Sequence, residues 1–130
     1  MDRRHLRLLL LVVVLIVFTT LLWFYLWSPV PEPDPLTTAV LEAAAERWWR
    51  PHTGHRWNIP EEEWPPELLR LRPKAVRVAP EGVFIPFKSV YIMERGLFIL
   101  PRASNYQPQQ GMDPSFQVLR GRVYKYEVKG

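Results

Sequence analysis

An uncharged apolar run near the N-terminus constrains this chain more than any other feature. Residues 8–27 read LLLLVVVLIVFTTLLWFYLW and contain no charged side chain. At about 1.5 Å per residue, a helix of this length crosses roughly the 30 Å hydrocarbon core of a bilayer. Its threonines can bond back to the helix backbone, and its aromatic residues gather at the far end, where such rings favour the headgroup layer. We therefore expect residues 8–27 to form a transmembrane helix in contact with the lipid bilayer.

The residues before this run predict its orientation. Arg3, Arg4, His5 and Arg7 precede it, and positive residues beside a span stay on the cytoplasmic side. We expect residues 1–7 to be a cytoplasmic stub in the inner membrane of a bacterium, with everything after residue 27 extracytoplasmic. The alternatives are a cleaved signal peptide and a buried helix of a soluble protein. A signal peptide usually has about 7–15 apolar residues and then small residues at its cleavage site, a pattern that this longer run lacks.

A proline-rich segment follows the span. Residues 28–35 read SPVPEPDP, and such alternation favours an extended polyproline conformation that acts as a semi-rigid spacer. Eight residues at about 3.1 Å each would separate the next element from the membrane by about 25 Å. A docking motif for a proline-binding domain is the alternative interpretation.

The remaining residues, 36–130, predict one small α+β domain. Asp34 can cap a helix and Pro35 suits its first position, while Pro51 ends the helical pattern. The apolar residues at helical spacing then form one face: Leu41, Ala44, Ala45 and Trp48. Shorter helical turns are expected after Pro60 and at residues 67–71.

From residue 75 onward, short segments rich in β-branched and aromatic residues predict about five strands. Turns are expected at residues 80–82, at residues 94–96 and at Gly121, which together suggest an antiparallel meander. One face of this sheet should pack against the main helix and the short helical turn at residues 68–71.

One long polar loop interrupts the strands. Residues 102–114 read RASNYQPQQGMDP, and loops of this length in a small domain are usually functional or disordered. Its polar and aromatic side chains are candidates for binding a partner: Tyr106, Gln109, Gln110 and Asp113. The alternative is an ordered flap whose Tyr106 packs onto the sheet.

The sequence contains no pattern typical of a catalytic, cofactor or metal site. The chain has no cysteine, which excludes thiolate nucleophiles and disulfides, and it has no glycine cluster for a phosphate or dinucleotide loop. His52 and His55 are candidate metal ligands, with a carboxylate from residues 61–63 as a third. Only two histidines are present there, however, whereas protein zinc sites use three or four protein ligands. We assign no catalytic residue, cofactor or metal site, and expect the tryptophans of residues 48–57 to pin this corner to the sheet.

The net charge does not indicate a nucleic-acid partner. Of the formal +4, the residues before the apolar run contribute +2, from three arginines and one aspartate, and the other basic residues are interspersed with glutamates. The expected function is therefore a membrane-anchored protein-interaction or accessory module for an envelope or membrane protein. The alternatives are a tethered enzyme or ligand-binding domain that uses loop 102–114, and a small accessory subunit whose anchor makes the main contact.

Overall fold

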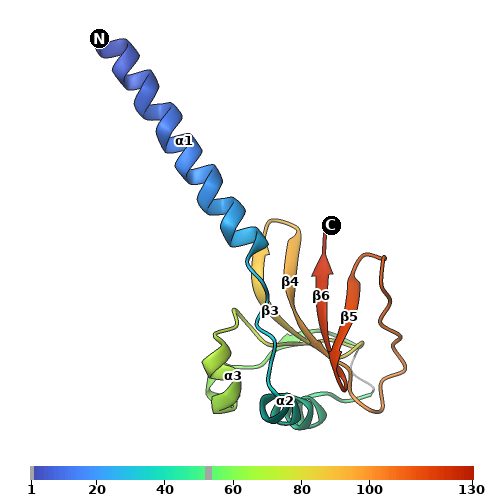
Figure 1. Cartoon of the computed structure of the whole chain (residues 1–130). Helices are drawn as coiled ribbons and strands as arrows, with labels where there is room; N and C mark the ends of the chain where they lie inside the picture. The colour runs from blue at the N-terminus through green and yellow to red at the C-terminus, as the bar shows by residue number, and fades with distance from the viewer. Residues whose placement is uncertain (1, 52–53) are drawn as a thin grey trace.

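The N-terminal helix projects from the rest of the molecule. The computed structural model describes residues 2–51 and 54–130, and α1 (Arg3–Trp27) forms one continuous helix with no buried residue (Figure 1). Among the described residues it is the one helix long and apolar enough to cross a membrane. Thr19 and Thr20 donate to the carbonyls of Leu15 and Ile16 at 2.7 and 2.8 Å, as the sequence predicts. The expectation of a long apolar N-terminal helix is confirmed.

The proline-rich segment is part of the folded domain. It runs from the end of α1 along the sheet to α2 (Figure 1), and Val30 and Pro33 are buried. Val30 belongs to the same core cluster as α2 and the sheet. Residues 28–35, expected to form a spacer before the domain, therefore lie against the domain as a strap, with Val30 in its core.

The main helix forms where its capping residues predict. Helix α2 (Pro35–Trp48) has Asp34 as its N-cap, whose side chain accepts from Thr37 N at 2.7 Å, and Pro35 at its first position. Leu41, Ala44 and Ala45 are buried against the sheet. Two shorter helical turns follow, η1 (Glu61–Glu63) and α3 (Pro66–Leu71).

The described residues form a six-stranded antiparallel sheet of order β1-β2-β3-β4-β6-β5. The strands are β1 (Trp57–Asn58), β2 (Arg77–Val78), β3 (Val83–Val90), β4 (Met93–Ile99), β5 (Ser115–Arg120) and β6 (Val123–Val128). The predicted α+β class is confirmed, and β1 adds a strand to the five expected. The order departs from a simple meander because the long loop carries the chain past β6, which leaves β5 at the edge.

The turn expected at residues 94–96 lies at residues 91–92 instead. Tyr91 and Ile92 connect β3 to β4, and Tyr91 adopts a left-handed φ of 53°. Gly96 lies inside β4, where a Cβ would collide with the carbonyl oxygen of Ile85 on β3. The glycine thus serves the close approach of two strands rather than a turn. The turns at residues 80–82 and at Gly121 form as expected.

Each face of the sheet carries its own apolar cluster. On one face, Val83, Ile85 and Leu97 pack with Leu41 of α2 and Leu68 of α3. The opposite face carries an aromatic cluster. Its buried members are Ala79, Phe84, Phe98, Phe116 and Tyr126. Among the described residues, α2 and α3 pack on the first face, and loop 102–114 contributes Tyr106 to the second.

Candidate functional site

Loop 102–114 is ordered by Tyr106. The Tyr106 ring packs edge-on against Phe98 and Phe116, with centroids 5.9 and 5.6 Å apart. Burial raises the pKa of Tyr106, and the nearby Glu81 adds to the effect. The ring contacts show that Tyr106 packs onto the sheet, as the interpretation of the loop as an ordered flap expects, while its side chain stays partly exposed.

The other three candidate residues of this loop divide into one anchor and two exposed side chains. Asp113 Oδ1 accepts from Lys129 N at 3.0 Å, which ties the loop to the segment after β6. The carbonyl of Gln109 accepts from Phe116 N at 2.9 Å. The side chains of Gln109 and Gln110 are exposed, and Gln109 and Asp113 border a depression of about 220 Å³. Among the four candidate residues, Gln109 and Gln110 are therefore exposed side chains for which no structural role is evident.

The outer edge of β5 meets loop 102–114 at one backbone bond, from Phe116 N to the Gln109 carbonyl, and the sequence did not identify this edge as a site. Because Phe116 donates outward to Gln109, strand alternation places the N–H and C=O of Val118 on the same outer edge. The Val118 side chain is 56% exposed, and Gln117 beside it is exposed as well. An edge strand with outward backbone groups and exposed side chains can pair with a strand from another chain.

A partly buried polar network lies beside the aromatic cluster and includes its buried Tyr126. Arg77 Nη2 donates to Glu94 Oε1 at 3.0 Å, and the Tyr126 hydroxyl donates to the same oxygen at 2.5 Å. Burial raises the pKa of Tyr126 far above its usual range, and the hydrogen bond to Glu94 reinforces the effect. A phenol held neutral in this way is neither a base nor a nucleophile at neutral pH. The network therefore fixes β2, β4 and β6 together.

The tryptophan-rich corner also has a structural role. Trp49 is buried, and its Nε1 donates to the carbonyls of Ala79 and Pro80 at 3.1 and 3.2 Å. These bonds pin the end of α2 to the sheet, as expected. The His55 ring lies 5.8 Å from the Trp57 ring. His52 lies outside the described residues, so the candidate pair is not placed. Within residues 2–51 and 54–130, no group of three His, Cys, Asp or Glu side chains could hold a metal ion.

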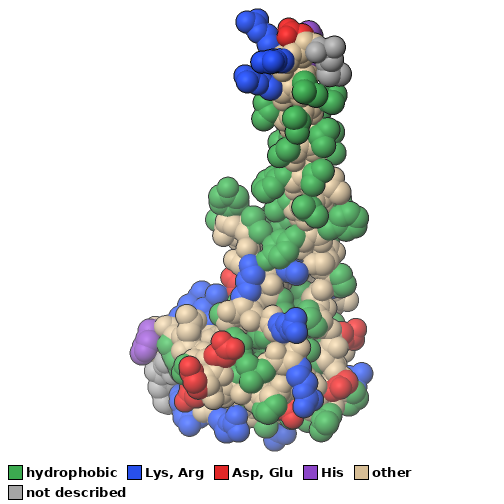
Figure 2. All heavy atoms as spheres, turned by 90° about the vertical axis from the view of Figure 1, so that its left-hand side faces the viewer, with side chains coloured by type: hydrophobic (Ala, Val, Ile, Leu, Met, Phe, Trp, Pro, Cys, Tyr) green, Lys and Arg blue, Asp and Glu red, His purple; other side chains and the backbone are tan. Residues whose placement is uncertain are grey.

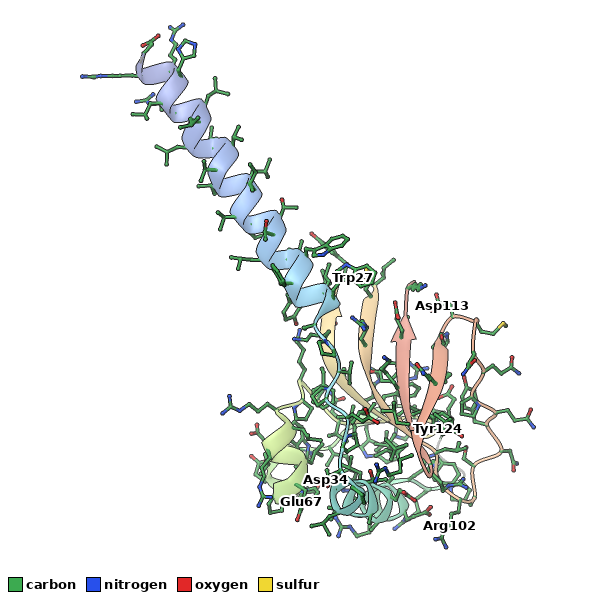
Figure 3. The ribbon with its side chains drawn as sticks, viewed as in Figure 1. Trp27, Asp34, Glu67, Arg102, Asp113 and Tyr124 are labelled. Carbon is green, nitrogen blue, oxygen red and sulfur yellow. The ribbon has the colours of Figure 1, made fainter. Side chains whose placement is uncertain are left out.

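The end of α1 contacts the domain through basic side chains. Arg95 Nη1 donates to the Leu26 carbonyl at 2.5 Å, and the ammonium groups of Lys74 and Lys88 lie 5.3 and 4.3 Å from the centre of the Tyr25 ring. Figure 2 shows Lys and Arg side chains gathered where the apolar helix meets the domain. Trp27 and Asp113 lie at this end of the sheet, whereas Asp34, Glu67 and Arg102 lie at the opposite end (Figure 3).

Comparison with protein-family models, with curated proteins and with solved structures gave no match.

Proposed function

We propose that the chain is a single-pass membrane protein whose domain binds an envelope or membrane protein through the edge of β5. The observation that supports the anchor is the exposure of α1, a 25-residue helix with no buried residue, in which only Tyr25 and Leu26 at its C-terminal end are partly covered. Each large apolar side chain left in water forgoes about 1.5–3 kcal/mol. A helix that is apolar all round and covered by nothing is stable only in lipid or inside another protein.

The charge around α1 supports an N-terminus in the cytoplasm. Three arginines lie within residues 3–7, and the next basic residue along the chain is Arg47. Such an asymmetry places the basic flank inside. The domain then lies on the extracytoplasmic side, which for a bacterial inner membrane is the periplasm.

The outer edge of β5 supports the interaction role. Val118 presents backbone donor and acceptor groups outward by strand alternation, and its side chain is exposed. Gln109 and Gln110 lie in loop 102–114, which contacts this edge where the Gln109 carbonyl accepts from Phe116 N. A partner that supplies an extended segment can pair with the edge at Val118 and bury its side chain, while the side chains of Gln109 and Gln110 bond the partner.

Site-specific crosslinking in native membranes tests this proposal. A photo-crosslinking residue at position 118 should give a discrete adduct, and the same residue at position 69, an exposed site on α3, should not. Val118→Pro removes the outward N–H and should abolish the adduct formed from position 117, whereas Val118→Thr should retain it. Adducts that form only from positions in α1 would instead favour an accessory subunit bound through its anchor, and an adduct unchanged by Val118→Pro would exclude strand pairing.

A further inference from the structure

We propose that the tip of the β3–β4 hairpin, Tyr91 and Ile92, is a second membrane contact that sits in the phospholipid headgroup layer beside α1. This inference rests on the proposed membrane anchoring by α1. It adds that the domain does not swing on a tether but lies against the bilayer in one orientation.

The first argument is the composition of the tip. Tyr91 is fully exposed and Ile92 is 67% exposed, so neither serves the core. Tyr91 also holds a φ of 53°, a conformation that asparagine or glycine adopts far more readily in a two-residue hairpin turn. Two large apolar residues at this position therefore cost the isolated domain stability and solubility. Contact with lipid would give both side chains a favourable environment.

The second argument is the position of the tip. The hairpin tip lies beside the last turn of α1, and the C-terminus lies at the same end (Figure 1). Arg95 on β4 bonds the Leu26 carbonyl, and Leu26, Trp27 and Met93 line a common depression of about 90 Å³. At about 3.3 Å per residue, Ile92 extends roughly 10 Å along the strand from Arg95. The tip thus reaches the layer occupied by the aromatic end of the helix.

The third argument is the chemistry of that layer. Tyrosine and tryptophan favour the membrane–water interface, and α1 ends in Trp23, Tyr25 and Trp27. Lys74 and Lys88 lie over the Tyr25 ring, where their ammonium groups can meet lipid phosphates. The apolar side chains of Tyr91 and Ile92 suit the acyl-chain side of the headgroup layer, and the cations Lys74 and Lys88 suit its phosphates.

Depth measurements with single labels test this inference. The chain has no cysteine, so Ile92→Cys, Ile16→Cys and Glu67→Cys each accept one environment-sensitive fluorophore on the full chain. The labelled proteins are placed in vesicles of phosphatidylethanolamine and phosphatidylglycerol. Quenching is then measured with aqueous iodide and with lipids that carry spin labels near the headgroup or near the acyl-chain end. None of the three side chains is buried, since Ile16 and Ile92 are exposed and Glu67 is partly exposed, and circular dichroism verifies that each label preserves the fold.

We expect the label at position 92 to be quenched several-fold more by headgroup-labelled lipid than the label at position 67, and to resist iodide. The label at position 16 should respond most to the deep spin label. If position 92 is as open to iodide as position 67 while position 16 is deep, the hairpin contact is refuted and the anchor stands. If position 16 is also open to iodide, the anchor itself is refuted and the hairpin contact with it.

Discussion

Replacing Tyr126 with phenylalanine tests whether its bond to Glu94 stabilises the sheet. The change removes the hydroxyl that donates to Glu94 Oε1 at 2.5 Å and keeps the ring within the aromatic cluster. A hydrogen bond to a charged group contributes about 1.5–3 kcal/mol. Because Arg77 still bonds the same carboxylate oxygen at 3.0 Å, Glu94 keeps a partner. We therefore expect a loss near the lower end, about 1.5 kcal/mol.

The pH dependence of this loss has a definite sign. The pKa of Tyr126 is raised in the folded domain, so its stabilisation is complete below the unfolded pKa of about 10 and is lost as pH rises above it. One pH unit beyond that point the unfolded phenol has gained about 1.4 kcal/mol from ionisation. The advantage of tyrosine over phenylalanine should therefore vanish near pH 11, at about the same magnitude.

Thermal unfolding of the full chain in detergent micelles, followed by circular dichroism near neutral pH and at about pH 11, measures both effects. Near neutral pH, Tyr126→Phe should lower the melting temperature by about 6–12 °C, at about 4–8 °C per kcal/mol for a domain of this size. Tyr124→Phe, on the same face of β6, is the matched control and should cost far less. If Tyr126→Phe matches the wild type at neutral pH, or if their difference does not change up to about pH 11, the hydroxyl does not hold Glu94 as described.

Two further substitutions test the close strand approach and the helix cap. Gly96→Ala should destabilise the domain by about 1–3 kcal/mol in the same unfolding assay, because the new Cβ meets the backbone of Ile85 and not a flexible side chain; Gly54→Ala, where nothing lies within 4 Å of the new Cβ, is the control. Asp34→Ala should lower the melting temperature of the domain at neutral pH, because it removes the N-cap of α2. Asp34→Asn keeps an acceptor for Thr37 and should lower the melting temperature less. Since the Thr37 N–H lowers the pKa of Asp34, this contribution is present above the unfolded pKa and is lost as pH falls through the folded pKa, so a difference that persists in strong acid would contradict the capping role.

The sequence predicts α1, the start of α2 and the turn at Gly121, because each depends on residues close together in the chain. The apolar run fixes α1, and the Asp34-Pro35 pair fixes the start of α2 with its cap bond to Thr37. Gly121 supplies the left-handed turn between β5 and β6. Each of these depends on neighbours within a few residues.

The turn between β3 and β4 was predicted in the wrong place for a physical reason. Tyr91 and Ile92 carry no turn signal, and Gly96 mimics one. Its true constraint is the Ile85 backbone on another strand, which no local pattern contains. The edge position of β5 likewise depends on β6 pairing with β4, a choice made by long-range packing.

The candidate site was predictable only in part. The length and polarity of loop 102–114 indicate a candidate binding loop, and the sequence leaves Tyr106 either as a contact for a partner or as an anchor on the sheet. The bond between Asp113 and Lys129 joins residues 16 apart, and the bond between Tyr126 and Glu94 joins residues 32 apart. Such pairs become visible only when the strands are assembled.

The most direct test of the proposed architecture is the sidedness of two single cysteines in bacterial spheroplasts. Gln110→Cys lies on the exposed loop of the domain and Asp2→Cys precedes α1, and the natural chain contributes no cysteine. We expect a membrane-impermeant maleimide to label position 110 in intact spheroplasts and to label position 2 only after lysis, with the protein retained in the membrane fraction. Labelling of position 2 but not position 110 before lysis would contradict the orientation, and release of the protein as a soluble chain would contradict the anchor.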